Sequence, residues 1–391
     1  MPGPLDGLVV LDLSRILAGP TCTQLMGDLG AEVIKIESPG GDDTRTWGPP
    51  FALDGEGKPT DLSAYFMSSN RNKKSVALDL TDPEAQKALH DLAGRADVVI
   101  ENFKPGGLRK YGLDHDTLCA AYPGLVYCSI SGFGQTGPNR DKPGYDLMAQ
   151  GFGGIMSITG EAGKEPMKVG VGVADVVCGL YATVGILAAL RHRDATGEGQ
   201  HIDIALVDAT MAWLVNQGLN YLTSGVAPTR AGNAHPNIVP YQVFETSDGY
   251  VIVAVGNDSQ FARFCDYLGR GEWASDPRFA TNGARLAHRD TLVPEIARIL
   301  AARDTDHVIA GLELRKVPVG PVNTIEQTLE SDQAQARDMT VTLPAPQTAK
   351  GEVRLLGNPL KFSRTPVSYR SAPPGIGADT EEILARIKSG L

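Results

Sequence analysis

The chain has 391 residues, of which 42% are hydrophobic and 21% charged, an ordinary globular balance that suffices for two domains. The formal net charge is −10 and no basic run interrupts the acidic balance, which argues against a nucleic-acid partner. Because the overall field would repel an anionic ligand, such a ligand would have to be held by local contacts.

The cysteines and the start of the chain bear on location and metal binding. Five cysteines are scattered without a C-x-x-C pair, which predicts reduced thiols in a cytoplasmic protein and no metal site. The opening M-P-G-P-L-D-G lacks the basic and apolar regions of a signal peptide, and no unbroken apolar run reaches membrane-spanning length. We therefore expect no membrane partner.

The first two hundred residues alternate short apolar strands with helices. Strands are predicted at 8–13, 33–36, 75–80, 98–100, 125–131 and 201–206. Between them we expect a helix that ends at Gly30, a helix from Asp82 and a long helix after Asp175. This alternation predicts an α/β fold with a doubly wound parallel sheet.

The alternation of strands and helices stops near Ser224, where a stretch rich in Pro, Asn and Gly indicates a linker. Two strands joined by S-D-G follow, then three helical stretches around 261–268, 292–301 and 307–314. We predict a large domain over 1–223, a smaller α+β domain over 224–325, and a C-terminal segment, 326–391, that returns to the large domain.

The run G-F-G-Q-T-G at 132–137 matches the dinucleotide-binding pattern and follows a strand. That motif requires a helix to open at its end, whereas here Pro138 and Asn139 follow, which is loop chemistry. A close backbone approach or a turn is therefore favoured over a nicotinamide site.

Asp175 is the one carboxylate between a glycine-spaced apolar run and a long helix of small apolar residues. A buried carboxylate needs compensation, and the start of a helix offers unpaired N–H groups and a positive dipole end. We expect the helix to begin right after Asp175 and to keep it ionised but poorly hydrated, which suits a nucleophile. The alternative is that Asp175 only caps the helix.

A basic cluster stands at Arg71, Lys73 and Lys74 in this otherwise acidic protein. Such a cluster is usually a solvated loop. The alternative is that it meets phosphate, since an anionic ligand needs local contacts.

Several segments together resemble the class III CoA-transferases, the family that includes formyl-CoA:oxalate and carnitine CoA-transferases. The similarity covers nearly the whole chain, in the order L-D-L-S-R-I-L-A-G-P-T, N-R-N-K-K-S-V-A-L-D-L, A-D-V-V-I-E-N-F-K-P-G, G-F-G-Q-T-G-P and A-D-V-V-C-G-L. The resemblance implies acyl-CoA and carboxylate substrates, no tightly bound cofactor, and an interlocked homodimer.

The resemblance also implies a covalent role for Asp175. The matching Asp of the family attacks the donor thioester and passes through an aspartyl anhydride to an aspartyl-CoA thioester. The acceptor carboxylate then takes the acyl position through a second anhydride. A dry apolar wall around the carboxylate fits this route, because water attack would waste the thioester energy.

The family's CoA site carries over onto four segments of this chain. These are the first loop, the end of the third strand, the E-N-F loop with a nearby lysine, and the loop that closes over the pantetheine: Leu17, Ala18, Leu78, Asp79, Leu80, Thr81, Asn102, Phe103, Lys104, Lys110, Lys142, Pro143, Gly144 and Tyr145. Leu17 and Ser38 replace a Gln and an Arg of the oxalate enzyme, which puts oxalate specificity in doubt.

The branch of the family is indicated by the segment G-N-A-H-P-N-I-V-P-Y-Q and by a lid that keeps only Gly256 of four glycines. Both resemble the transferases of dicarboxylates such as succinate and glutarate. Arg15, Arg71 or His235 is then expected to meet the far carboxylate.

Two alternatives stay open from the sequence. A 2-methylacyl-CoA racemase of the same fold needs a His-Asp pair where this chain has Tyr145-Asp146. A Tyr with an ordinary pKa of about 10 is a poor base at neutral pH, so a transferase with Asp146 beside its site is favoured. The other alternative is a non-catalytic acyl-CoA binding protein.

Overall fold

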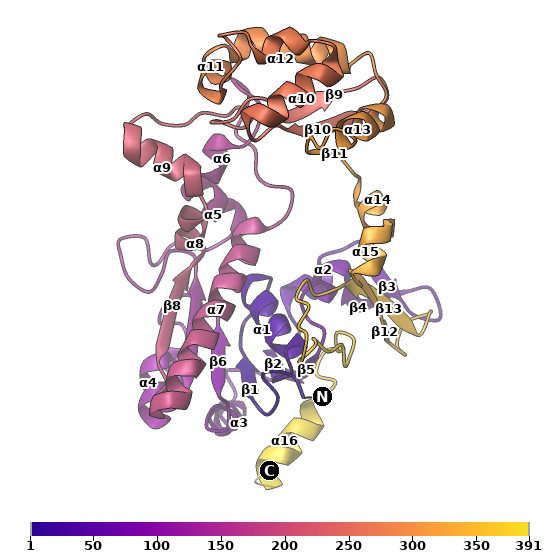
Figure 1. Cartoon of the computed structure of the whole chain (residues 1–391). Helices are drawn as coiled ribbons and strands as arrows, with labels where there is room; N and C mark the ends of the chain where they lie inside the picture. The colour runs from indigo at the N-terminus through magenta and orange to yellow at the C-terminus, as the bar shows by residue number, and fades with distance from the viewer. Residues whose placement is uncertain (1, 390–391) are drawn as a thin grey trace. The chain divides into compact units, whose positions relative to one another are not determined.

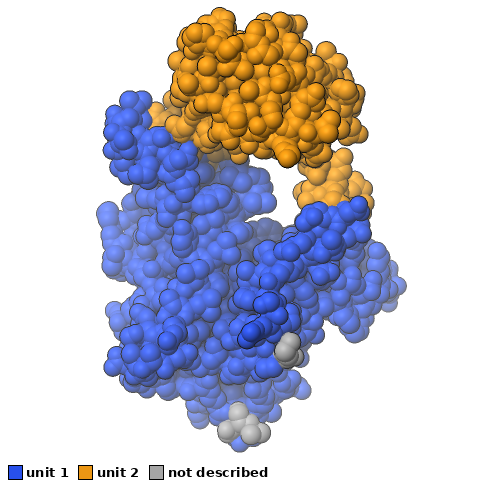
Figure 2. Space-filling view, in the orientation of Figure 1, with its two compact units in different colours: residues 1–155, 168–226, 332–391 blue, residues 156–167, 227–331 orange. Residues whose placement is uncertain are grey.

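A computed structural model describes residues 2–389, and these residues form two units (Figure 2). Unit 1 spans Met1–Ile155, Lys168–Val226 and Asp332–Leu391, and unit 2 spans Met156–Met167 and Ala227–Ser331. The sequence analysis left 156–167 in the large domain, whereas its contacts place it in unit 2.

Unit 1 is built on a six-stranded sheet, all of whose neighbouring strands run parallel. Its spatial order is β5-β2-β1-β6-β7-β8, with bounds β1 Val9–Asp12, β2 Glu32–Glu37, β5 Lys73–Ala77, β6 Val98–Glu101, β7 Val126–Ser131 and β8 His201–Ala205. The strand order reverses between β1 and β6, the switch point at which such sheets bind ligands. The predicted mixed α/β class with a large parallel sheet is confirmed.

One face of this sheet is covered by α1 (Ala18–Asp28), α5 (Asp146–Phe152), α7 (Val173–Thr196) and α8 (Leu206–Ala212), with α1 packed along α7 (Figure 1). The two helices approach closely at Gly179, where a β-carbon would lie 2.5 Å from the Ala18 carbonyl oxygen. The small residues of α7 are therefore a packing requirement.

Among residues 2–389, α7 is one helix whose length and mean hydropathy of 2.0 would suit a membrane span. Of its most apolar window, 61% is buried inside the protein. Burial against α1, α5, α8 and the sheet accounts for that apolar character, as in the core helix of many globular proteins.

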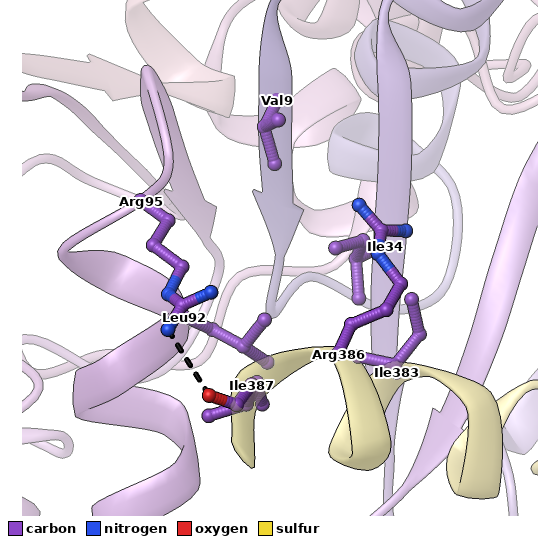
Figure 3. Close-up of a pocket in the computed structure, with 7 residues that line it drawn as sticks. All are labelled: Val9, Ile34, Leu92, Arg95, Ile383, Arg386 and Ile387. Atoms are coloured by element: carbon purple, nitrogen blue, oxygen red, sulfur yellow. Dashed lines mark hydrogen bonds between the residues drawn. The ribbon is translucent and has the colours of Figure 1, made fainter. Parts of the chain in front are cut away.

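The opposite face of the sheet is covered by α3 (Pro83–Ala93), α4 (His115–Ala121) and the C-terminal helix α16 (Thr380–Ser389). A cavity of about 290 Å³ lies between α3, α16 and the strands β1 and β2 (Figure 3). Its charged groups are already used, since Arg386 pairs with Glu32 at 2.6 Å and Arg95 donates to the Ile387 carbonyl.

The rest of unit 1 consists of short elements around the sheet. Two antiparallel pairs are β3 (Phe51–Leu53) with β4 (Pro59–Ser63), and β12 (Thr340–Pro344) with β13 (Glu352–Leu356). The short helices are α2 (Ala64–Met67), α9 (Val215–Ser224) and α15 (Asp332–Ala336), and α6 (Ile155–Ile158) stands where the chain passes to unit 2.

Unit 2 contains the antiparallel sheet β11-β10-β9, formed by Val319–Pro321, Tyr250–Ala254 and Tyr241–Glu245. Its helices are α10 (Asp258–Leu268), α11 (Asn282–Ala287), α12 (Arg289–Leu300), α13 (Thr305–Glu313) and α14 (Ile325–Glu330). The predicted hairpin and the three predicted helices are present, around a core of Phe261, Phe264, Ile296 and Val308.

Candidate active site

The loops after β1 and β6 meet at the switch point of the sheet. The Asn102 side chain accepts a hydrogen bond from the Arg15 N–H at 3.0 Å and donates one to the Arg15 carbonyl at 2.7 Å. One amide side chain therefore fixes the backbone of the neighbouring loop in both directions. The predicted Asn102 therefore holds the loop after β1 in place through these two hydrogen bonds.

A pocket of about 320 Å³ opens beside these two loops. It is lined by five residues predicted to bind CoA, by the predicted Arg15, and by charged and polar residues of β2 and the following loop: Leu78, Asp79, Leu80, Thr81, Phe103, Arg15, Lys35, Glu37, Ser38 and Asp42. The lining also includes Tyr111, whose ring lies 4.5 Å from the Nζ atom of the predicted Lys110. Lys104 is exposed in the loop that follows Phe103.

The first loop leads from this pocket to the start of α7. Arg15 lines the pocket, and two residues later the Leu17 side chain reaches Gly172, where a β-carbon would lie 3.1 Å from Leu17 Cδ2. The predicted Ala18 then begins α1 and packs against α7. The predicted first-loop residues therefore lie between the pocket and the helix that carries Asp175.

Asp175 stands in the first turn of α7, which begins at Val173, three residues earlier than the sequence predicted. The free N–H groups of this helix end do not serve Asp175, because the Asp146 carboxylate accepts the N–H of Ala174 at 2.8 Å and that of Asp175 at 3.5 Å. Asp146, from the start of α5, is thus the cap of α7, although it is 28 residues away. The reading of Asp175 as the cap is wrong.

This arrangement raises the pKa of Asp175 from 3.8 to about 7, through burial first and the nearby Asp146 charge second. The residue is 8% exposed, and among residues 2–389 no group donates a hydrogen bond to its carboxylate. The sequence predicted an ionised Asp175, whereas with a pKa of about 7 its protonated and ionised forms coexist near neutral pH. A carboxylate so poorly solvated is reactive whenever it is ionised.

The loop before α5 brings the predicted Lys142, Pro143, Gly144 and Tyr145 next to the G-F-G-Q-T-G turn. A β-carbon on Gly132 would lie 2.5 Å from the Gly144 Cα, and the reverse distance is the same. The two glycines permit this close backbone contact, as the sequence analysis favoured. All four residues of the loop are exposed, and Asp146 follows them directly.

Comparison with known proteins places this geometry in a family. Residues 5–380 match the family described as CoA-transferase family III. The chain belongs to CoA-transferase family III. It is 48% identical to a succinate–glutarate CoA-transferase of Agrobacterium fabrum, over 99% of this chain and 96% of that protein.

Two further relatives agree. The chain is 39% identical to the human succinyl-CoA:glutarate CoA-transferase, over 98% of this chain and 86% of that protein. A CAIB/BAIF family protein from Brucella suis has a crystal structure with a TM-score of 0.87 and 48% identity, covering 99% of this chain and 100% of that one. The protein is a CoA-transferase, and the racemase alternative is not retained.

Two residues near Asp146 and Asp175 of this family III chain were not predicted from the sequence. Gln150 donates to Asp146 Oδ2 at 2.7 Å and accepts the Val169 N–H at 2.9 Å. Its spacing of four from Asp146 on one helix was a signal that could have revealed the pair. Burial, followed by the charges of Asp175 and Asp146, raises the pKa of the half-buried Tyr65. Nothing in the sequence around Tyr65 points to that neighbourhood.

The predicted role of Arg71 is contradicted by the structure. Its guanidinium is buried and bonds both oxygens of Asp28, at 2.9 and 2.6 Å, and the Leu356 carbonyl at 2.7 Å. Lys73 is buried as well, with its Nζ 3.1 Å from Asp12 Oδ2. Arg71 and Lys73 are therefore engaged in buried ion pairs within unit 1, and the partly exposed Lys74 pairs with Glu32 at 3.2 Å and Glu382 at 2.6 Å.

The predicted His235 and Gly256 belong to unit 2. His235 Nδ1 accepts the Asn237 N–H at 3.0 Å, and burial together with the charge of Arg289 lowers the pKa of this imidazole. Gly256 lies between β10 and α10, where its N–H donates to Gln260 Oε1 at 2.7 Å. Over residues 2–389, no three His, Cys, Asp or Glu side chains gather as a metal site.

Replacing Asp146 by Asn is expected to move the acidic limb of kcat/KM to lower pH. The Asn side chain still accepts the N–H of Ala174, whereas removal of the like charge lowers the pKa of Asp175 toward its usual value. More of the Asp175 carboxyl is then ionised at pH 6 than in the unmodified enzyme. A pH–rate profile from pH 5 to 9 measures the shift, and an unchanged limb contradicts it.

Proposed function

We propose that this CoA-transferase moves CoA between dicarboxylic acids of the succinate and glutarate class, with Asp175 as the covalent nucleophile. The observation that carries the proposal is a nearly dry carboxylate, without a hydrogen-bond donor among residues 2–389, at the end of a loop that starts in the 320 Å³ pocket. The names of the Agrobacterium and human relatives support the substrate class.

The reaction proceeds in balanced steps. Ionised Asp175 attacks the thioester carbonyl, the C–S bond breaks, and CoA leaves as a thiolate, which gives a mixed anhydride on Asp175. The thiolate attacks the Asp175 carbonyl and releases the donor carboxylate, which leaves an Asp175–CoA thioester. The acceptor carboxylate then attacks the Asp175–CoA thioester, which releases the CoA thiolate and forms a second anhydride. The thiolate attacks the acceptor carbonyl of this anhydride, which gives the new acyl-CoA and frees the Asp175 carboxylate. Thioester energy is retained throughout because water is kept from the carboxylate.

The nucleotide end of CoA is assigned to the 320 Å³ pocket, with Lys104 and Lys110 at exposed positions suited to its phosphates. The pantetheine then follows the first loop toward Leu17 and the segment Lys142–Tyr145. Arg15, whose side chain is 59% exposed and forms a surface ion pair with Asp43 at 2.9 Å, remains the candidate for the far carboxylate of the acceptor.

Trapping tests this proposal directly. The enzyme is incubated with succinyl-CoA, treated with hydroxylamine or borohydride, and digested for mass spectrometry. Modification is expected on the peptide that contains Asp175 and on no other acidic peptide. With the same preparation, CoA transfer to glutarate should be faster than transfer to a monocarboxylate of equal length. Equal rates would contradict the dicarboxylate assignment but not the role of Asp175.

The family III chain is further proposed to work as an interlocked homodimer. Large apolar side chains of unit 1 stay exposed along α7, α8 and α9, and they need a cover: Leu180, Tyr181, Val184, Met211, Leu219 and Leu222. A second copy is the cover consistent with the class. Light scattering should give about twice 41.5 kDa. Mixing tagged and untagged dimers should give no mixed species over days, because threaded chains exchange only by unfolding; rapid exchange contradicts threading.

A further inference from the structure

Ile16, in the loop between β1 and α1, adopts a backbone conformation that its side chain disfavours. Its φ is +72°, the left-handed region, and a β-branched residue there costs about 1–2 kcal/mol. Such a conformation persists only when the surroundings hold it. The loop lies between the 320 Å³ pocket and Gly172 at the start of α7, so its shape decides where Leu17 lies.

Asp42 supplies the hold on Ile16. Its Oδ2 accepts the Ile16 N–H at 3.2 Å and also accepts Lys35 Nζ at 2.9 Å. The same ammonium donates to the Ser14 carbonyl at 2.8 Å, so the loop is pinned at both ends of its kink. The backbone of Arg15, between them, is fixed by Asn102.

Asp42 is itself firmly placed. Its Oδ1 accepts both the N–H and the hydroxyl of Thr44, at 3.0 and 2.8 Å, and its own N–H donates to Glu37 Oε2 at 2.8 Å. Burial alone would raise the pKa of Asp42, but the Lys35 charge and the Thr44 hydrogen bonds lower it below its usual value. The carboxylate therefore stays ionised, and its geometry is set by the fold.

We propose that Asp42 is a positioning residue for acyl transfer. It lines the pocket assigned above to the nucleotide end of CoA, and it holds the left-handed Ile16 that sets Leu17 against the helix end carrying Asp175. The inference rests on the proposed function, since it needs that pocket to take CoA and Asp175 to be acylated. Binding of the remote nucleotide then steadies the loop that shapes the reacting centre.

The decisive measurement is the single-turnover rate at which Asp175 is acylated. Asp42→Asn keeps an oxygen acceptor but loses the charge that fixes Lys35, and it is expected to slow acylation by roughly 10- to 100-fold, the size of a displacement of about 1 Å. The second variant, Ile16→Gly with Asp42→Asn, should recover most of this loss, because glycine takes a positive φ without being held.

Asp61→Asn is the matched control for a merely structural effect. Asp61 pairs with Arg45 at 3.0 Å in the same ionic cluster but touches neither the pocket lining nor the loop. It should lower the thermal midpoint and leave the acylation rate unchanged. If the glycine variant gives no recovery, or if Asp61→Asn slows acylation as much as Asp42→Asn, the inference is overturned.

A further variant covers the case in which Asp42→Asn fails to fold. Thr44→Val removes one of the two hydrogen bonds that Thr44 donates to Asp42 Oδ1 and should slow acylation less, again with recovery by Ile16→Gly. Failure of the proposed function looks different, because the unmodified enzyme would then carry no acyl group on Asp175. If Asp175 is acylated but none of these variants changes the acylation rate, the inference about Asp42 is overturned and the proposed function stands.

Discussion

Asp175→Asn is expected to lower CoA exchange at least about 10⁴-fold, because an amide cannot form the anhydride and no other group at the site takes over a covalent step. The fold stays intact, since the amide has nearly the same shape as the acid. Initial rates of succinyl-CoA consumption with glutarate measure the loss. An exchange rate within tenfold of the unmodified enzyme would mean that a group other than Asp175 is the nucleophile.

The same variant should be more stable than the unmodified protein, by an amount that grows as pH rises from about 4 to about 7. Asp175 has a folded pKa of about 7 against 3.8 as the reference, so the folded state binds the extra proton between these values. Stability is therefore lost as pH rises from about 4 to about 7. The Asn variant escapes this penalty, by about 1–4 kcal/mol at pH 8.5 and by little at pH 3.5. Denaturant midpoints at both pH values measure it; a pH-independent difference contradicts the raised pKa.

Gly132→Ala is expected to cost more than about 3 kcal/mol of stability and most of the activity. Its new methyl would lie 2.5 Å from the Gly144 Cα and 2.9 Å from the Gly144 nitrogen, and backbone atoms cannot move aside as a side-chain end does. The loop 142–145 must shift, and with it Asp146, which caps the helix of Asp175. Denaturant unfolding and kcat together register both effects.

Gly137→Ala, in the same glycine-rich turn, is the matched control. Gly137 has φ +85° and no atom within 4 Å of a β-carbon, so the substitution carries only backbone strain of about 1 kcal/mol. Activity should be retained. If both alanine variants lose stability equally, then the backbone conformation, and not the contact with Gly144, explains the glycines.

The sheet and its helices could be predicted from the sequence because both obey local periodicity. The run Val126–Ser131 is entirely buried and reads as a central strand, and the apolar spacing of Ala85, Leu89 and Leu92 marks one helix face. The hairpin of unit 2 could also be predicted, from its S-D-G turn. Element ends were less certain, as α7 shows by starting before Asp175.

Charge pairing across the chain could not be predicted in this way. Arg71 looked like a surface cation because its partner Asp28 is 43 residues away, and Asp146 caps a helix 28 residues further on. No periodicity encodes such pairs. The first follows from the pairing of β2 with β5, and the second from the packing of α5 against α7. The position of Asp175 could be predicted, whereas its raised pKa depends on where Asp146 lies.

The crowding of two acidic groups at one helix end has a consequence for the lifetime of the enzyme-bound species. In the mechanism proposed above, acylation or thioesterification of Asp175 would turn a poorly solvated anion into a neutral group and remove its repulsion with Asp146. Hydrolysis would recreate that anion in the same apolar surroundings. The free enzyme would thus be the form with two repelling carboxylates, and the acylated enzyme would lack that repulsion until the acceptor carboxylate reacts.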